Sequence, residues 1–307
     1  MEAHVRRILI LLFLILGDTV CPHTAQAATN AVAWGYNYYG QTDVPDYAFT
    51  AIAAGHYYSL GIRTDGTLAA WGGNDPGQTD VPSGTFSAIA AGSYHSLAIG
   101  ANGTLAAWGS NSYGQTNVPG GTFVAIAGGY IHSLGLRTDG TLAIWGDPYF
   151  QTGMPTGTFR AIAAGDGHSL AIRTDGTLVA WGRNLEGQTN VPSGTFSAIA
   201  AGGSYSLAIR TDGTLAAWGN EGESYVPSGT FSAISTAGYW SLALRTDGTL
   251  VAWGDDHYGQ TDIPGGTFSA IAAGGFHGLA VPEPSGLLAL GMGGLGMLGA
   301  ALRRRSR

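Results

Sequence analysis

Charge and sulfur are scarce in this sequence, and their scarcity removes several kinds of partner. Only 11% of the 307 residues are charged, and residues 28–281 contain no lysine, seven arginines and seventeen acidic residues. Because nucleic acids and anionic lipids bind basic surfaces, this region with a net charge of −10 is expected to bind neither. The single cysteine, Cys21, lies outside the region, which therefore cannot form a disulfide or a cysteine-ligated metal site.

Helical periodicity is also absent, and a repeat takes its place. No segment of residues 28–281 is long enough and periodic enough for an amphipathic helix. One unit instead recurs seven times, and its tryptophans are separated by 35 to 37 residues, at Trp34, Trp71, Trp108, Trp145, Trp181, Trp218 and Trp253. A period of this length predicts a solenoid, an array or a propeller, and units made of strands favour the propeller.

Each unit has the pattern of short antiparallel strands. In one copy, Phe196–Gly202 contains small and branched residues, Tyr205–Arg210 alternates apolar with polar residues, and Leu215–Trp218 is apolar. Asp212-Gly213 indicates a hairpin turn, and the Gly-Gln-Thr-x-Val-Pro segment that follows most tryptophans indicates a fourth strand at an edge. The sequence therefore predicts an all-β fold, a seven-bladed β-propeller of four-stranded antiparallel blades over residues 28–281.

The two ends of the repeat region share one hairpin between them. Asn30–Trp34 has no Asp-Gly turn before it, and His277–Val281 has none after it. The first strand is therefore expected to pair with the last, which would close the ring and remove both open edges.

The first 27 residues have the three regions of a secretory signal peptide. Arg6-Arg7 precedes an apolar run from Ile8 to Leu16, and Ala25-Gln26-Ala27 precedes Ala28. Cleavage is expected between Ala27 and Ala28, and the apolar run is too short to span a bilayer. The sequence thus predicts a protein that passes through the secretion machinery.

The C-terminal residues 282–307 form a separate segment. Pro282-Glu283-Pro284 is followed by an uncharged stretch, residues 286–302, and then by Arg303-Arg304-Arg305. The pattern predicts a short hydrophobic transmembrane helix with a basic cytoplasmic end. The order of triplet, apolar run and arginines resembles the PEP-CTERM sorting signal of Gram-negative bacteria. An ordinary C-terminal anchor is the alternative.

That resemblance implies a route for the protein. An exosortase would cut near Pro282-Glu283-Pro284 after a transient stay in the inner membrane, where the tail contacts the lipid. The protein would then pass to the cell surface or the extracellular matrix.

The repeat itself resembles the regulator-of-chromosome-condensation (RCC1) repeat. The resemblance rests on Trp-Gly-x-Asn-x-x-Gly-Gln-Thr, as at Trp108–Thr116, and on Ala-Gly-x-x-His-Ser-Leu-Ala, as at Ala91–Ala98. It implies a seven-bladed propeller, similar to the compact bacterial secreted members, one of which inhibits β-lactamase. The family includes a nucleotide-exchange factor, ubiquitin-ligase modules and protein inhibitors, which are joined mainly by protein binding, so the fold does not specify the function.

The variable loops of the repeat are rich in aromatic residues. The turns between the first and second strands and the loops after the third should meet on one face, where tyrosine provides large contact area for a protein or stacks on sugars. The candidate partner-binding residues are Tyr36, Tyr38, Tyr39, Tyr57, Tyr94, Tyr113, Tyr130, Tyr149, Phe150, Tyr239, His257, Tyr258 and Phe276. The alternative is that these rings only cover the ends of the core.

Two other repeated positions are interpreted as structural. The seven tryptophans lie in apolar strands, which favours a core between blades over a carbohydrate platform. One residue per blade forms a second column, Tyr58, His95, His132, His168, Tyr205, Trp240 and His277. A metal site at its histidines is disfavoured, because equivalent residues of different blades lie too far apart to share one ion.

Catalysis finds little support. The sequence has no Gly-x-Ser-x-Gly, no His-Glu-x-x-His and no phosphate-binding glycine loop, and it indicates no cofactor. The function expected is that of an exported, non-enzymatic binding or scaffold propeller whose aromatic loops recognise an extracellular protein or polysaccharide. A polysaccharide lyase or hydrolase that uses loop carboxylates is the main alternative. A regulator of nucleotide exchange, suggested by family analogy, is inconsistent with export.

Overall fold

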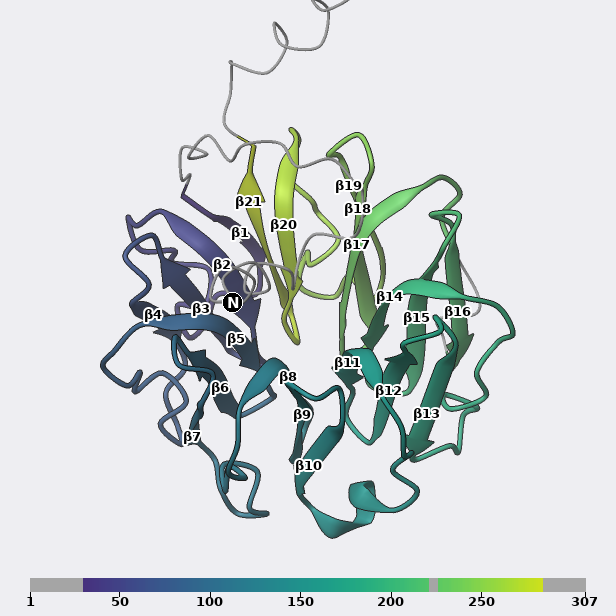
Figure 1. Cartoon of the computed structure of the whole chain (residues 1–307). Coiled ribbons are helices and arrows are strands. Elements are labelled where there is room, and N and C mark those ends of the chain that lie inside the picture. The colour runs from purple at the N-terminus through teal and green to yellow at the C-terminus, as the bar shows by residue number, and fades with distance from the viewer. Residues whose placement is uncertain (1–29, 221–225, 284–307) are drawn as a thin grey trace, which may run out of the picture.

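The computed structural model describes residues 30–220 and 226–283, which form seven three-stranded antiparallel sheets. The sheets are arranged as blades around a central axis (Figure 1), which confirms the predicted all-β, seven-bladed propeller. The predicted signal peptide, residues 1–27, and the predicted transmembrane segment, residues 286–302, lie outside the described residues. Within the described ranges no helix is long and apolar enough to cross a membrane.

Six blades are made of consecutive strands. In chain order, blade 1 holds β2 (Phe49–Ala54), β3 (Tyr58–Arg63) and β4 (Leu68–Gly72); blade 2 holds β5 (Phe86–Ala91), β6 (His95–Gly100) and β7 (Leu105–Gly109); blade 3 holds β8 (Phe123–Gly128), β9 (His132–Arg137) and β10 (Leu142–Gly146). Blade 4 holds β11 (Phe159–Ala164), β12 (His168–Arg173) and β13 (Leu178–Gly182); blade 5 holds β14 (Phe196–Ala201), β15 (Tyr205–Arg210) and β16 (Leu215–Gly219); blade 6 holds β17 (Phe231–Ala237), β18 (Trp240–Arg245) and β19 (Leu250–Gly254).

Blade 7 joins the two ends of the described chain. Its strands are β20 (Phe268–Ala273), β21 (His277–Pro282) and β1 (Val32–Gly35). The first strand pairs with the last, in a register that runs from Val32 opposite Ala280 to Gly35 opposite His277. This pairing is the ring closure that the divided hairpin predicts, and it joins the first and last strands in one sheet.

The predicted fourth strand of each blade is wrong. The Gly-Gln-Thr segment forms a closed loop, in which the Asn74 side chain donates to Asp80 Oδ1 (2.8 Å) and accepts from the Thr79 amide (2.9 Å). The Asp80 amide also bonds to the Gly77 carbonyl (3.2 Å). Because these groups are satisfied within the loop, they are not available to a sheet ladder, and the blade ends at its third strand.

The hairpin turn is one residue longer than Asp-Gly alone. In blade 1 the Arg63 amide bonds to the Thr67 carbonyl (2.8 Å), so the loop comprises Thr64, Asp65 and Gly66. Gly66 has a φ of +83°, which favours glycine, and Asp65 Oδ1 accepts from the Thr67 amide (2.9 Å). The turn is therefore a three-residue loop with glycine in the left-handed position.

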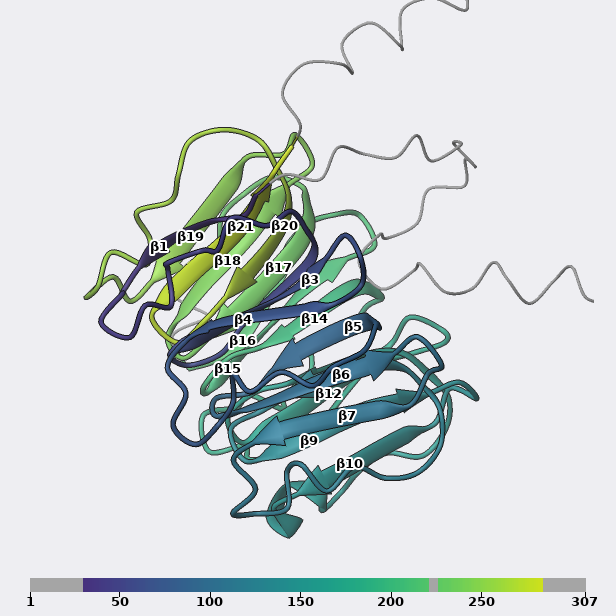
Figure 2. The ribbon, with the colours of Figure 1, turned by 90° about the vertical axis from the view of Figure 1, so that its left-hand side faces the viewer.

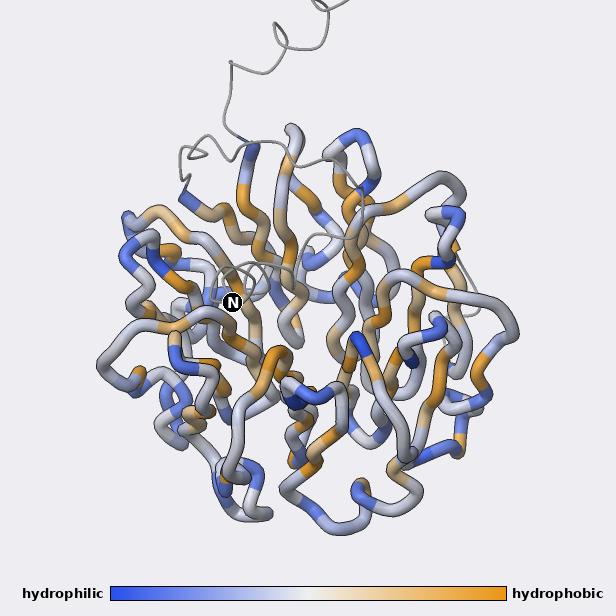
Figure 3. Tube along the Cα trace, viewed as in Figure 1, coloured by the Kyte–Doolittle hydropathy of each residue, from blue (hydrophilic) through white to orange (hydrophobic). Residues whose placement is uncertain are grey.

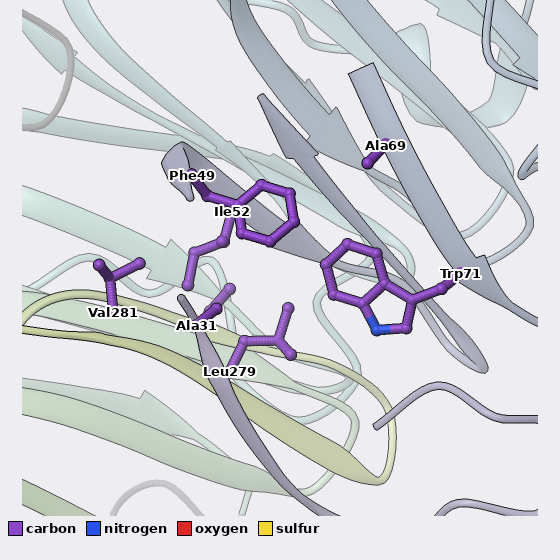
Figure 4. Close-up of a cluster of buried hydrophobic side chains, with 8 residues drawn as sticks. Ala31, Phe49, Ile52, Ala69, Trp71, Leu279 and Val281 are labelled. Carbon is purple, nitrogen blue, oxygen red and sulfur yellow. The ribbon is translucent and has the colours of Figure 1, made fainter. Parts of the chain in front are cut away.

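The apolar core lies in the seams between neighbouring blades. In the seam between blades 7 and 1, Leu279 and Val281 pack with Phe49, Ile52 and Trp71 (Figure 4). Figure 3 shows the same segregation over the whole ring, with hydrophobic residues along the strands and hydrophilic residues in the outer loops. Each blade thus buries its faces against its neighbours.

Tryptophan and glutamine link each seam by a hydrogen bond. The indole Nε1 of Trp71 donates to the carbonyl of Gln41 in the loop that precedes the blade (2.9 Å). The same bond is formed by Trp34, Trp108, Trp145 and Trp218 with Gln260, Gln78, Gln115 and Gln188, at 2.8 to 2.9 Å. The glutamine side chains are almost fully buried. We call this contact the tryptophan–glutamine latch.

The glutamine side chain also holds its own loop together. Gln41 Oε1 accepts from the Tyr39 amide (3.0 Å), two residues earlier, and Gln115 and Gln260 form the same bond. Gln78 Oε1 has no partner among the described residues, because the residue two positions earlier is Pro76, which has no N–H.

The latch is missing in two seams. The indole N–H groups of Trp181 and Trp253 have no partner within the described part of the chain. The loop before Trp181 contains a short 3₁₀ helix, η1 (Pro148–Gln151), in which the Gln151 side chain bonds to the Gly146 carbonyl (3.1 Å). Before Trp253, residues 220–225 contain no glutamine.

The two kinds of tryptophan allow a matched test of the latch. Trp218→Phe is expected to lose about 1 kcal/mol more unfolding free energy than Trp181→Phe, because only Trp218 loses a hydrogen bond. Urea denaturation of both variants measures the difference. Trp181→Ala, which also empties the seam, should cost about 3–5 kcal/mol. Equal losses for the two phenylalanine variants would contradict the latch.

Candidate functional site

Two kinds of loop meet at one end of the propeller. The Gly73 amide, after strand β4, bonds to the Tyr57 carbonyl in the turn between β2 and β3 (2.8 Å), and Tyr36 bonds in the same way to Phe276 (2.9 Å). We call this end the loop face, and the opposite end, which carries turns such as Thr64–Gly66, the turn face. Figure 2 shows the ring from the side, with loops at both ends of the strands.

Aromatic rings from blades 7 and 1 gather at the centre of a cluster on the loop face. The ring centroids of Tyr36 and Tyr258 are 4.7 Å apart, those of Tyr258 and Phe276 are 5.2 Å apart, and those of Tyr57 and Phe276 are 5.7 Å apart. Tilted and edge-to-face arrangements at these separations are favourable. The rings therefore form one contiguous surface across a blade seam.

The cluster continues on both sides of this centre. Tyr38 and Tyr39 are 5.0 Å apart, Tyr39 lies 5.1 Å from Tyr57, and His257 lies 4.8 Å from Tyr258. In the other direction, His56 lies 5.5 Å from Tyr94, which lies 6.1 Å from Tyr130. We define the aromatic cluster as Tyr36, Tyr38, Tyr39, His56, Tyr57, Tyr94, Tyr130, His257, Tyr258 and Phe276.

The other candidate residues stand apart from the aromatic cluster. Tyr149 and Phe150 form a pair of their own (5.2 Å), beside His132. Tyr113 and Tyr239 are exposed and make no ring contact among the described residues. The structure thus selects one part of the predicted aromatic surface, over blades 7, 1, 2 and 3.

His56 is a member of the cluster that the sequence analysis missed. Its ring lies 4.4 Å from Tyr57 and 5.0 Å from Phe276, and so connects the two halves of the cluster. The signal that could have identified it is its place in the turn, since equivalent positions vary strongly between copies, from Ser93 to Asp166. Backbone hydrogen bonds, such as that from the His56 amide to the Ser93 carbonyl (3.2 Å), connect several of these turns to the turn of the next blade.

Crowding changes the acid–base properties of the cluster. Burial raises the pKa of Tyr36, Tyr57 and Tyr94, and neighbouring tyrosines raise each further. Burial also raises the pKa of Asp166, against the opposing effect of Arg183, and lowers the pKa of His56. The cluster therefore presents neutral rings and hydroxyl groups, with little charge, to a ligand.

The column of histidines links adjacent blades. Nε2 of His277 lies 2.8 Å from Ser59 Oγ in the next blade, and the Ser59 hydroxyl donates to the Gln41 carbonyl (3.0 Å). Since that hydroxyl has a single proton, His277 must donate to Ser59 from Nε2. Equivalent contacts pair His95, His132 and His168 with Ser133, Ser169 and Ser206, at 2.8 to 3.0 Å.

The hydrogen bond to serine uses Nε2 of each histidine and leaves Nδ1 without a partner in the described part of the chain. Nδ1 of all four column histidines is buried and has no partner among the described residues. In the same part of the chain, no three His, Cys, Asp or Glu side chains lie close enough to hold a metal ion. The column is therefore a set of contacts between blades. Tyr58 and Tyr205 take the same place in two blades, and Tyr205 Oη lies 2.8 Å from Ser241 Oγ.

This column makes stability depend on pH. Burial lowers the pKa of His95 and His168 to about 4 and that of His132 and His277 to about 3. The unfolded chain, with a histidine pKa near 6.5, binds more protons, so stability is full above about pH 6.5 and falls as the pH drops toward 4. Each histidine should cost on the order of 2 kcal/mol at pH 5, measured by urea denaturation.

Substitution by the residue of a neighbouring blade provides the control. His168→Tyr should reduce the pH dependence of unfolding between pH 6.5 and 4 by about one proton, because tyrosine stays neutral there. An unchanged slope would show that His168 does not contribute to acid sensitivity.

Three carboxylates on the loop face accept hydrogen bonds from their own loops. Asp147 Oδ1 accepts from the Tyr149 amide (2.9 Å), Asp255 Oδ2 from Gln260 Nε2 (2.9 Å), and Asp256 Oδ1 from the Thr261 amide (2.8 Å). Glu221 lies outside the described residues. These three acids shape their loops.

Comparison with known families gives a match to both parts of the chain. The regulator of chromosome condensation (RCC1) repeat matches residues 49–78, 86–115, 159–188, 196–224 and 233–260, and the PEP-CTERM protein-sorting motif matches residues 280–305. No curated protein sequence matches the chain.

Several solved structures share the fold. Yeast RCC1 (Prp20), crystallised with Kap60, is 18% identical with a TM-score of 0.73, and the match covers 89% of this chain and 91% of that chain. Human WBSCR16 is 18% identical with a TM-score of 0.70, covering 83% and 99%. The ectodomain of the Physcomitrella patens receptor kinase CR4 is 22% identical with a TM-score of 0.68, covering 78% and 71%.

The repeats and the blades together define a β-propeller of the RCC1 type. The five repeat matches and the RCC1 structures that share the fold support an RCC1-like propeller, and the chain carries a PEP-CTERM motif whose match begins within its last strand. Such a motif indicates an exported protein that is sorted to the surface, with processing by an exosortase during export.

Proposed function

We propose that this protein is a non-enzymatic binding propeller, displayed on the cell surface or in the extracellular matrix. Its aromatic cluster would recognise an extracellular protein or polysaccharide. The observation that carries the proposal is the cluster itself, a contiguous group of rings from four neighbouring blades.

Exposure within the cluster favours binding over mere coverage of the core. The Tyr38, Tyr39 and Tyr258 side chains are 78%, 49% and 42% exposed. A ring that only closes the end of a core would be expected to lie mostly buried. Exposed tyrosine offers a large, rigid surface and a hydroxyl group at little cost in conformational entropy, which suits a protein surface or a stacked sugar ring.

The hydrogen bonds of three loop acids argue against a catalytic role for these three in the enzymatic alternative. A glycosidase or lyase needs carboxylates free to act on the substrate. Asp147, Asp255 and Asp256 instead accept hydrogen bonds from their own loops. Regulation of nucleotide exchange has no support in an exported protein.

Sorting completes the proposed route. Cleavage near Pro282-Glu283-Pro284 would release the propeller from its hydrophobic tail. The propeller would then reach the surface with its blades intact, since the pairing between β1 and β21 ends at Ala280, before the triplet.

Substitutions within and outside the cluster test the binding proposal. The test uses a fragment that comprises residues 28–283. Replacing Tyr38, Tyr39 and Tyr258 together by serine in this fragment should weaken its binding to the ligand at least about tenfold, because central aromatic residues dominate interface energies. Pull-down from the extracellular fraction and a glycan array identify the ligand, and titration then measures its affinity.

Tyr113 and Tyr149 provide the matched control. Their side chains are 52% and 65% exposed but lie outside the cluster, so Tyr113→Ser with Tyr149→Ser should leave affinity unchanged. An equal loss in both variants would reject the cluster as the site. Release of product from a polysaccharide by the parent protein would favour the enzyme instead.

A further inference from the structure

The sorting triplet begins inside the sheet of blade 7. Pro282 is the last residue of β21 and pairs with Phe268 of β20. The next amide, that of Glu283, donates to the Thr267 carbonyl (2.9 Å). The first two residues of the triplet are thus held by the folded propeller.

Comparison with the other blades shows why no linker intervenes. The Thr211 amide bonds to the Thr195 carbonyl (3.1 Å) in blade 5, and Phe196 pairs with Arg210. Pro282 therefore occupies the place of Arg210, and Glu283 that of Thr211. The triplet replaces the residues that elsewhere end the middle strand and start the hairpin turn.

Processing requires a different state of this backbone. Cleavage beside the triplet needs a nucleophile to add to a peptide carbonyl carbon, while the amine leaves with the nucleophile's proton. The enzyme must surround the extended peptide on both sides, whereas one side of Pro282 and Glu283 faces β20. Local opening must come first.

We propose that the end of β21 separates from β20 before an exosortase can process the triplet, so that folding of blade 7 slows sorting. The opening is confined to the strand end. Val281 can stay paired with Ala270, and the pairing with β1 extends only to Ala280, so the ring stays closed. Release of the Glu283 bond and of the pairing between Pro282 and Phe268 at a strand end costs little compared with unfolding the blade, and sorting is therefore slowed but not blocked.

A linker at the junction tests this proposal. Insertion of Gly-Ser-Gly-Ser between Val281 and Pro282 frees the triplet and keeps its spacing to the apolar segment. In a Gram-negative host with an exosortase, pulse-chase labelling should show processing at least about twofold faster than in the parent, because opening no longer has to break the contacts of the strand end. The same insertion between Gly120 and Gly121, an exposed loop, is the control and should process at the parental rate.

Hydrogen exchange gives a second readout that does not depend on the exosortase. The Glu283 amide should be protected in the parent and unprotected in the junction variant. Equal processing rates in parent and junction variant, or an unprotected Glu283 amide in the parent, would overturn the proposal.

The position of the triplet carries a second inference. β21 starts at His277, beside Phe276 of the aromatic cluster, and ends at Pro282 on the turn face. Six residues of strand span about 17 Å, so the triplet and the cluster lie at opposite ends of the blade. We infer that the sorted propeller holds its turn face toward the structure that anchors it and presents the aromatic cluster outward. This inference rests on the proposed surface display.

Single cysteines can measure this orientation, because residues 28–283 contain none. Tyr113→Cys lies on the loop face outside the aromatic cluster, Ser193→Cys lies on the turn face, and both positions are exposed. A bulky polyethylene-glycol maleimide should label Tyr113→Cys faster than Ser193→Cys on intact cells, with a rate ratio several times that of the two purified proteins.

The junction linker again supplies the control. With Gly-Ser-Gly-Ser before Pro282 the propeller can reorient, and the labelling ratio on cells should return to that of the purified proteins. If the variants without the linker already show the same labelling ratio on cells as the purified proteins, the proposed orientation is wrong. The labelling needs no ligand, so its failure is distinct from failure of the binding proposal.

Discussion

Five of the seven seams are joined by the latch between the tryptophan of one blade and the glutamine carbonyl of the loop before it. A single buried glutamine serves both neighbours, since its backbone accepts the indole N–H while its side chain holds its own loop. The hydroxyl of Ser59 donates to the same Gln41 carbonyl and accepts a hydrogen bond from Nε2 of His277 in blade 7. The Gln41 carbonyl thus lies where apolar packing and hydrogen bonds between the blades come together. A buried polar group without a partner at this position would lower the stability of the fold.

The latch also explains where the sequence is free to vary. Positions that face a seam repeat in nearly every copy, because each must satisfy the same buried neighbours. Residues beyond the latch, on the loop face, meet no such requirement, and there the copies differ: His56, Ser93 and Asp166 take equivalent places. Aromatic residues on adjacent blades can therefore gather into one surface while the ring remains unchanged.

The proposed sites of attachment and recognition lie at opposite ends of one strand. β21 pairs with β1 to close the ring, carries the first residue of the sorting triplet at one end and borders the aromatic cluster at the other. The blade that closes the propeller is therefore also the blade through which the exported protein would be held. In the proposed route, this arrangement would couple folding, sorting and display without a linker.

The sequence by itself determined the number of units, the three strands that each blade contains and the pairing of the two chain ends, because period and turn residues are local signals. It also restricted the candidate site to the aromatic loops. Tertiary structure decided the rest: Gly-Gln-Thr forms a latch loop instead of a fourth strand, since its partners are Asn74 in the same loop and a tryptophan of the next blade. Likewise, only the ring geometry joins His56 to Tyr94 and leaves Tyr113 and Tyr239 apart. Distances between blades are not encoded in any one repeat, because they arise when seven of them close a circle.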